Sequence, residues 1–276
     1  MKILLGISVG ALIVYGLICL GIYMLQEKLI FPGPSLSSEY KFFIPPHLTV
    51  KEVHLDKGSA HLHGFYVQAS QSQGVVLFFH GNGGSVQDWI TVADRFVDRG
   101  FDILIMDYRG YGKSRGERSQ ALLLEDAEAA YEYLRKDWPD RSILVYGRSL
   151  GSGFASYIAA RHPVGCLMME TPYLSLLKIS KDRFPYLPVN YLMQYPMPSR
   201  EYLTQVDCPI FLIHGTADRV IPVQHSQELS RIPQNKYVVY EEVAGGTHHD
   251  LELYPQYRDW LEEGLEALPS AQNDVE

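Results

Sequence analysis

Short apolar runs recur through the middle of the chain, and each covers three to five residues. Continuous runs of this length are typical of strands that are buried on both faces of a sheet. Segments with helical character separate most of them. The predicted strands lie at 75–79, 102–106, 142–146, 167–169 and 210–213, and the predicted helices at 85–97, 120–134, 150–160 and 250–268. This alternation predicts an α/β domain with a mainly parallel central sheet and helices on both faces.

Two earlier segments, 50–55 and 61–68, alternate between polar and apolar residues. Such alternation is typical of strands with one buried face, and Lys57-Gly58 between them predicts an antiparallel hairpin. A last strand is predicted at 237–243, directly before a loop that contains glycine.

Polar residues mark the expected starts of two helices. Ser85, with Asp88 three residues further on, predicts an N-cap for the helix at 85–97. Asp250 predicts the cap of the last helix, and Pro255 is expected to interrupt the first turns of that helix.

The longest apolar stretch lies at the N-terminus, where residues 3–25 form a run of 23 residues without a charge. As a helix this run spans about 34 Å, enough to cross a hydrocarbon core of about 30 Å. Its end, Ile22 to Gln26, lacks the small residues of a signal-peptide cleavage site. We therefore expect an uncleaved transmembrane anchor, followed by a stem at 26–49 that contains the helix-breaking residues Phe31-Pro32-Gly33-Pro34.

The charges that flank the anchor predict its orientation. Lys2 precedes it, whereas Glu27 and Lys28 nearly cancel after it. The positive-inside tendency then favours a single-pass protein of the cell membrane, with its folded domain on the extracytoplasmic, periplasmic side.

The folded domain is predicted at 50–268, before a polar, flexible tail at 269–276. One insertion, 172–206, is too long for a plain connection between strands. It is rich in proline and aromatic residues. Two interpretations stay open, a small cap that forms an apolar pocket over the site and a purely structural excursion.

The net charge of −8 argues against a nucleic-acid partner, because phosphate binding needs a basic surface. The three cysteines, Cys19, Cys166 and Cys208, have no metal-site spacing. The last two are expected to be small buried side chains, and their pattern does not predict a disulfide.

Gly147-Arg148-Ser149-Leu150-Gly151 matches the pattern G-x-S-x-G between a predicted strand and a predicted helix. In that setting the turn holds the serine in a strained conformation at a helix N-terminus, where it can act as a nucleophile. The two glycines remove side chains that would clash at so sharp a turn.

A nucleophilic serine needs a base, and the base needs an acid that orients it. Asp218 follows the strand at 210–213 at the carboxyl edge of the sheet, and Glu170 is the rival acid. Three histidines follow Asp218. His225 is expected on a surface helix, which leaves His248 and His249 on the glycine-containing loop.

Acyl transfer also needs donors for the developing oxyanion. The backbone N–H of Leu150 is one candidate. The loop His80 to Gly84 should supply the other through Asn82, with Gly83 as the alternative. A phosphate cradle is the rival interpretation of this loop, but the lysine and the hydroxyl residue of a P-loop do not follow it.

Several other polar residues have weaker patterns. The segment 107–114 either lines the pocket or forms a tight turn in which Arg109 pairs with Asp107. His61 and His63 share one face of a strand, but no third metal ligand lies near them in the sequence, so we predict no metal site and no cofactor. His80 and His214 are expected to be packed and hydrogen-bonded near the site.

Taken together and in this order, six motifs resemble those of the membrane-anchored α/β-hydrolase-domain serine hydrolases, which include bacterial proteins, eukaryotic depalmitoylases and monoacylglycerol-type lipases. The motifs are Gln26 to Pro32 (QEKLIFP), His80 to Gly84 (HGNGG), Asp107 to Ser114 (DYRGYGKS), Gly147 to Gly151 (GRSLG), His214 to Asp218 (HGTAD) and Thr247 to Asp250 (THHD).

The resemblance implies a catalytic triad of Ser149, Asp218 and His248. The final motif of the family resembles G-x-H-N-D, so His249 stands here in place of asparagine. The implied activity is hydrolysis of an ester, thioester or lipid acyl bond, without a cofactor and through an acyl-enzyme on Ser149. A peptidase similar to prolyl oligopeptidase and a non-catalytic membrane-anchored binding protein are the alternatives. The expected partners are a small-molecule or lipid acyl substrate and the membrane.

Overall fold

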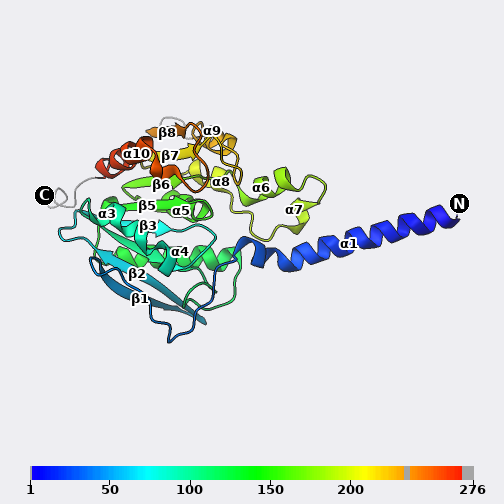
Figure 1. The fold of residues 1–276 in the computed structure, drawn as a ribbon, viewed down its shortest axis with the longest axis horizontal. Helices are drawn as coiled ribbons and strands as arrows, with labels where there is room; N and C mark the ends of the chain where they lie inside the picture. The colour runs from blue at the N-terminus through cyan, green and yellow to red at the C-terminus, as the bar shows by residue number, and fades with distance from the viewer. Residues whose placement is uncertain (1, 233–236, 269–276) are drawn as a thin grey trace.

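The computed structural model describes residues 2–232 and 237–268 of the chain (Figure 1). Within these residues, eight strands form one sheet in the order β1-β2-β4-β3-β5-β6-β7-β8. The strands are β1 (Thr49–Lys57), β2 (Ala60–Gln68), β3 (Gly74–Phe79), β4 (Phe101–Met106), β5 (Ile143–Arg148), β6 (Cys166–Glu170), β7 (Ile210–Gly215) and β8 (Val238–Val243).

The sheet has the predicted mixture of directions. β1 and β2 form the antiparallel hairpin, and β2 pairs antiparallel with β4. All the pairs from β4 through β3, β5, β6 and β7 to β8 are parallel. Every residue of the five strands from β3 to β7 is buried, as their continuous apolar runs predict.

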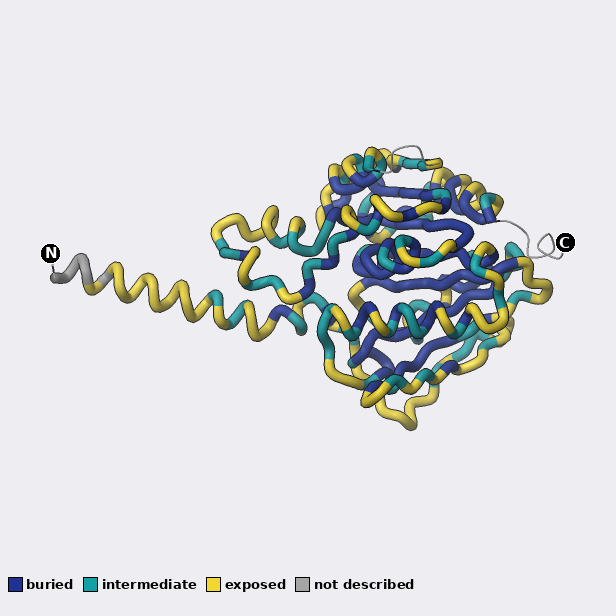
Figure 2. The backbone as a smooth tube through the Cα atoms, turned by 180° about the vertical axis from the view of Figure 1, so that it is seen from behind, coloured by how far each residue is buried: buried dark blue, intermediate teal, exposed yellow. Residues whose placement is uncertain are grey.

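Alternate side chains of each strand enter separate cores on the two faces of the sheet. In β3, Leu77 joins the core that packs against α4 (Gln120–Leu134) and α5 (Gly151–Arg161). Phe78 joins the core that packs against α3 (Asp94–Val97) and α10 (Pro255–Glu266). Figure 2 shows the resulting buried centre of the domain. The prediction of a mainly parallel sheet covered on both faces is confirmed.

Two predicted helices differ in detail from the observed ones. The segment 85–97 divides into α2 (Val86–Trp89), a 3-10 turn and α3, although Ser85 and Asp88 form the predicted capping box. Pro255 does not interrupt the last helix but begins α10, where a proline is tolerated because the first N–H groups need no helical partner. Asp250 precedes a 3-10 turn, and its carboxylate accepts the N–H of Thr247 instead of capping α10.

The predicted pairing of Arg109 with Asp107 is wrong. Arg109 instead makes a two-pronged ion pair with Asp126 of α4, with N–O distances of 2.6 and 2.7 Å. Both side chains are almost fully buried. Asp107 accepts the backbone N–H of Val86 at 2.9 Å and so fixes the start of α2.

Arg109→Met is expected to lower the free energy of unfolding by about 3 kcal/mol, because it leaves the Asp126 carboxylate buried without its partner. Arg135→Met removes an arginine whose ion pairs are exposed to solvent, and should cost less than about 1 kcal/mol. Urea titration of the full chain in detergent micelles, followed by circular dichroism, measures both. Equal losses in the two variants would contradict this assignment.

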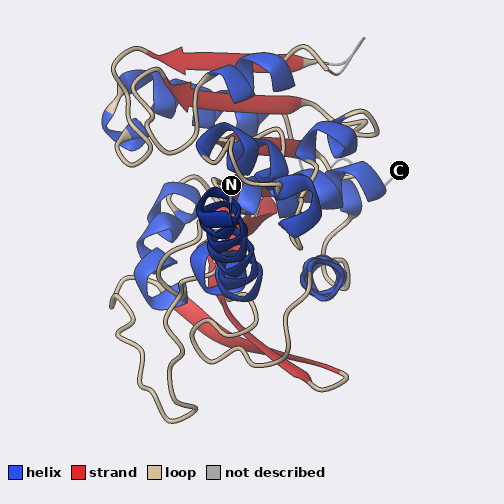
Figure 3. Cartoon of the chain, turned by 90° about the vertical axis from the view of Figure 1, so that its right-hand side faces the viewer, coloured by secondary structure: helices blue, strands red, loops and turns tan. Residues whose placement is uncertain are grey.

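The N-terminal helix α1 (Lys2–Ile30) leaves the domain as a long projection, which Figure 3 views nearly end-on. Its segment Ser8–Ile30 is long and apolar enough to cross a membrane, and none of its most apolar window is buried against the rest of the molecule. The helix continues five residues past the predicted boundary at Leu25. The start of the expected stem is therefore helical, and it packs on the domain: Glu27 pairs with Arg118 at 2.8 Å.

The insertion at 172–206 contains α6 (Leu176–Arg183), α7 (Val189–Leu192) and α8 (Ser199–Leu203). Figure 1 shows α6 and α7 extending from the domain beside α1. The side chain of Gln26 connects the two, because it donates to the carbonyl of Leu192 and accepts the N–H of Gln194.

Candidate active site

Ser149 occupies the sharp turn between β5 and α5. Its φ angle is +52°, a left-handed conformation that is strained for a residue with a side chain. A Cβ on Gly147 would lie 2.6 Å from the carbonyl oxygen of Gly151, and a Cβ on Gly151 would overlap the carbonyl of Phe79. The two glycines of the motif therefore permit the tight contact of strand, turn and helix that presents Ser149.

The loop after β8 brings His248 to this turn. Its Nε2 lies 2.9 Å from Ser149 Oγ, and its Nδ1 lies 2.6 Å from Asp218 Oδ2. An ionised carboxylate can only accept hydrogen bonds, so Nδ1 carries the proton and donates it to Asp218. Nε2 is then free to accept the hydroxyl proton of Ser149.

Asp218 is held by more than His248. Its Oδ1 accepts the backbone N–H groups of Val220 and Ile221, and His214 Nε2 lies 3.2 Å from its Oδ2. Burial alone would raise the pKa of Asp218, but the hydrogen bonds from His214 and His248 outweigh it and hold that pKa well below its usual range. The carboxylate is therefore ionised at neutral pH.

The rival residues lie elsewhere. Glu170 is buried, and its carboxylate contacts the Tyr146 hydroxyl and the Arg148 guanidinium. His249 is exposed and stacks edge-on against His248. The expectation that His225 lies on the surface is wrong: it is 2% exposed, and its Nδ1 accepts the N–H of Leu174.

The loop His80 to Gly84 lies against the serine turn. A Cβ on Gly81 would be 3.9 Å from the Cβ of Ser149. The hydroxyl of Tyr111 donates to the carbonyl of Asn82, and Asn82 lines the same cavity as Ser149. His80 is buried, as predicted, and its burial lowers its pKa, so the imidazole that supports the loop is neutral.

Two cavities meet at Ser149. One cavity, of about 440 Å³, is mostly apolar. Its wall is formed by Leu150 beside Ser149, by Leu176 and Ile179 of the insertion, and by Leu29 and Ile30 at the end of α1. The other, of about 430 Å³, is bounded by the glycine loop, Trp89, Arg148 and both histidines of the last loop. Asn82 also borders both cavities.

Arg148 is a residue that the sequence motif contains but does not explain. Its guanidinium lies 3.0 Å from Glu170 Oε1, 3.3 Å from the carbonyl of His248 and 5.4 Å over the ring of Trp89. It therefore connects β5 to the loop that carries His248. Only tertiary contacts reveal this, because its partners lie far apart in the sequence.

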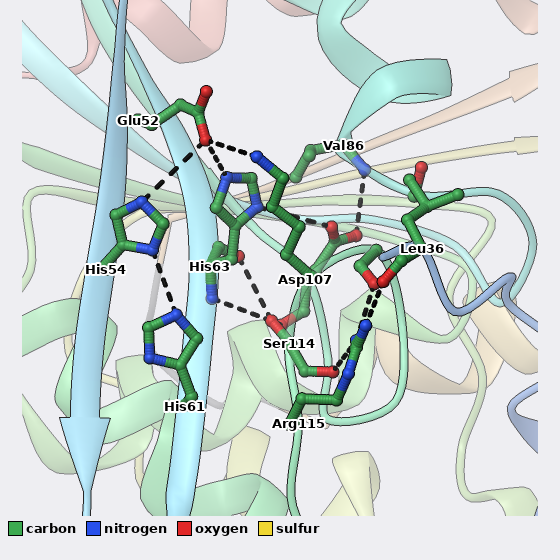
Figure 4. A network of polar contacts seen from close by, with 12 residues as sticks. Leu36, Glu52, His54, His61, His63, Val86, Asp107, Ser114 and Arg115 are labelled. Carbon is green, nitrogen blue, oxygen red and sulfur yellow. Dashed lines mark hydrogen bonds and ion pairs between the residues drawn. The ribbon is translucent and has the colours of Figure 1, made fainter. Parts of the chain in front are cut away.

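The hairpin histidines form a separate polar cluster (Figure 4). His63 Nε2 lies 2.9 Å from Glu52 Oε2, and His54 lies beside the same carboxylate. Strand pairing thus brings together three residues that could hold a metal ion, a grouping that the sequence did not reveal. The ammonium of Lys113 already contacts that carboxylate at 3.1 Å. His61 instead contacts Asp56 and His54.

Comparison with known proteins places these features in a family. The family model described as serine aminopeptidase, S33 matches residues 70–176. An uncharacterised protein of Mycobacterium tuberculosis is 31% identical over 258 residues, which cover 90% of this chain and 88% of that protein. The mouse α/β-hydrolase domain-containing protein 17C is 31% identical over 202 residues, which cover 71% of this chain and 60% of that protein.

Solved structures agree on the fold. An esterase of Pyrococcus furiosus superposes with a TM-score of 0.67 at 20% identity, covering 87% of this chain and 98% of the esterase. An α/β hydrolase of Vibrio vulnificus gives a TM-score of 0.66 at 24% identity, covering 78% and 81% of the two chains. This chain therefore belongs to the α/β-hydrolase-domain family and is a hydrolase with the α/β-hydrolase fold.

Proposed function

We propose that this protein is a serine hydrolase that cleaves a carboxylic ester, thioester or lipid acyl bond through an acyl-enzyme on Ser149. The observation that carries the proposal is the continuous pair of hydrogen bonds from Ser149 Oγ to His248 Nε2 and from His248 Nδ1 to Asp218 Oδ2. A serine hydroxyl without such a base is a poor nucleophile.

The proposed reaction has two stages. His248 takes the proton of Ser149 as Oγ attacks the acyl carbonyl, and then gives that proton to the departing alcohol or thiol. Water attacks the acyl-enzyme in the second stage, with His248 again as the base. The backbone N–H groups of Leu150 and Asn82 hold the oxyanion in both stages, and Asp218 stabilises the imidazolium.

We propose a side for each half of the substrate on the basis of the two cavities. The apolar cavity, with Leu29 and Ile179 in its wall, suits an acyl chain. The second cavity borders His248, which must protonate the leaving group, so the alcohol or thiol belongs there.

The matching family model describes aminopeptidases, which must hold the ammonium group of a peptide. A carboxylate would serve that purpose, but the charged side chains that line the apolar cavity are those of Arg183 and Arg219. This charge favours an uncharged or anionic acyl substrate over a peptide N-terminus.

We further propose that Ser8–Ile30 is a single-pass anchor in the cell membrane, because its length and hydropathy suit a bilayer. Lys2 before the anchor favours the extracytoplasmic side for the folded domain. A membrane location supports a lipid, lipidated or membrane-derived substrate.

A fluorophosphonate probe is expected to label the full-length protein in detergent, with the adduct on Ser149 in the peptide mass spectrum. Hydrolysis of p-nitrophenyl esters should then become more efficient as the acyl chain lengthens from acetyl, until the chain fills the apolar cavity. Peptide p-nitroanilides are the comparison substrates. Folded protein that takes up no probe, or that cleaves the anilides faster than every ester, contradicts the proposal.

A further inference from the structure

We propose that the tip of the cap, defined as residues 184–192, inserts into the lipid surface beside α1, so that the apolar cavity over Ser149 opens toward the membrane. This inference rests on the proposed membrane anchor. It identifies the route by which an acyl chain enters the site, directly from the lipid layer.

The cap tip lies along α1. The hydroxyl of Tyr15 donates to the carbonyl of Tyr186 at 2.8 Å, and nearer the domain Gln26 donates to the carbonyl of Leu192 at the same distance. Gln194 adds a hydrogen bond to the carbonyl of Tyr23. The cap therefore follows α1 from Tyr15 to Gln26, and Figures 1 and 2 show it beside the end of α1 that joins the domain.

The position of Tyr15 in the apolar run sets the depth of the tip. The uncharged run begins at Ile3 and a spanning helix needs about 20 residues, so the lipid boundary on the domain side lies at Ile22 or beyond it, within the proposed anchor Ser8–Ile30. Tyr15 lies seven residues before Ile22, which is about 10 Å along the helix axis. A tip that contacts Tyr15 thus lies at least about 10 Å below the lipid boundary, at the deep end of the range of about 5–10 Å at which interfacial segments insert.

The composition of the tip suits this depth. Residues 184–199 carry no charge, and the aromatic rings at the tip point into solvent: Tyr186 is 90% exposed and Tyr191 87%. Tyrosine is enriched where protein crosses the membrane–water interface.

The backbone of the tip also suits an apolar environment. Pro185 and Pro188 have no N–H group, and the N–H groups of Leu187, Val189 and Tyr191 donate to carbonyls within the tip. Internal pairing is what a backbone in lipid requires.

Basic residues stand where lipid headgroups would lie. Lys181 and Arg183, at the end of α6, directly precede the tip, and Lys28 follows the apolar run of α1. Asp182 and Glu27 lie beside them, so three basic side chains stand against two acidic ones. This small positive excess contrasts with the net charge of −8 and is complementary to anionic headgroups. Arg183 also lines the apolar cavity, which links the headgroup level to the site.

The depth of the tip can be measured with a fluorophore that responds to water. The full chain, in a Cys19→Ser background, is labelled with nitrobenzoxadiazole at Tyr186→Cys and reconstituted into vesicles of phosphatidylcholine and phosphatidylglycerol. We expect blue-shifted emission that a nitroxide-bearing lipid quenches and iodide does not. Tyr237→Cys, an exposed tyrosine before β8, is the control expected to respond to iodide alone.

A label at Leu12→Cys, in the middle of α1, separates the two proposals. If the label at position 12 lies in lipid and the label at position 186 lies in water, the inference is overturned and the proposed anchor stands. Labels in water at both positions overturn the anchor, and the inference with it.

A functional comparison adds an independent test. The double variant Tyr186→Asp, Tyr191→Asp should lower turnover of a long-chain acyl ester dissolved in vesicles by about tenfold or more, because charge is costly at this depth. Turnover of a soluble short-chain ester should stay unchanged. Tyr237→Asp should change neither. Equal turnover of the vesicle substrate by wild type and the double variant contradicts the inference.

Discussion

His248→Ala is expected to lower kcat/KM for an acyl ester by about four to six orders of magnitude, comparable to the loss in Ser149→Ala. The reason is geometric. His248 Nε2 is the imidazole nitrogen 2.9 Å from Ser149 Oγ, so its removal leaves the hydroxyl without an acceptor for its proton. Steady-state hydrolysis of a soluble ester by purified variants measures the loss.

The neighbouring histidine provides a matched control. His249 is exposed, and its ring meets the His248 ring edge-on. His249 borders the second cavity, but the nitrogens that meet Ser149 Oγ and Asp218 Oδ2 belong to His248, so His249→Ala should retain kcat/KM within about tenfold. The combination Ser149→Ala, His248→Ala should be no slower than either single variant, because the two residues act as one unit. A large loss in His249→Ala, together with an active His248→Ala, would show that the base is His249 and would contradict the assignment of His248.

Most of the fold was predictable because its signal is local. A strand buried on both faces is mostly apolar, and the runs at 75–79 and 102–106 correspond closely to β3 and β4, although the second begins with the buried Asp102. Helix α4 has the predicted bounds, since its alanine, leucine and glutamate residues all favour helix. The parallel direction of these strands also follows from the alternation of strands and helices, whereas their order in the sheet, with β4 between β2 and β3, does not.

The incorrect predictions concern partners that are distant in the sequence. The acid that pairs with Arg109 is Asp126 on α4, not Asp107 two residues away. His225 lies on a helix, as predicted, but is buried because its Nδ1 meets the backbone of Leu174 from the insertion. Spacing along the chain does not contain this information, since it depends on how the helices pack against the sheet.

The candidate site likewise has some features that the local sequence predicts and others that depend on residues distant in the sequence. The turn that carries Ser149 and the order of acid and histidine have local signatures, and the structure brings Ser149, Asp218 and His248 together. The wall of the apolar cavity has no local signature in the sequence, because Leu29 and Ile30 belong to α1 and reach the site only where the start of the stem packs on the domain. The role of Arg148 is likewise visible only in three dimensions.

Asp218→Asn is expected to lower kcat/KM by about 10⁴-fold with little change in the fold. The carboxylate accepts the Nδ1 proton of His248 at 2.6 Å and so leaves Nε2 unprotonated toward Ser149. An amide nitrogen in its place would favour the other tautomer, with the proton on Nε2, which cannot accept the serine proton. Ester hydrolysis measures the loss, and Glu170→Gln is the matched control.

Glu170 is buried at the end of the neighbouring strand, but it contacts Tyr146 and Arg148 rather than His248. Its amide variant should retain at least about a hundredfold more activity than Asp218→Asn, because the tautomer of the base is unchanged. The reverse order of activities would make Glu170 the acid.

A second measurement on Asp218→Asn uses the stability of the protein. The pKa of Asp218 in the folded protein lies well below its usual range, so the folded state binds fewer protons than the unfolded state as the pH falls. The ionised carboxylate therefore stabilises the fold above the ordinary aspartate pKa of about 4, and this contribution is lost as the pH falls toward the lowered value. The asparagine variant lacks it, so the difference in melting temperature between wild type and variant should be largest at neutral pH and should narrow in acid. If the difference in melting temperature stays constant from neutral to acidic pH, His214 and His248 do not hold the Asp218 carboxylate in its ionised form. The proposed orientation of His248 by that carboxylate would then be contradicted.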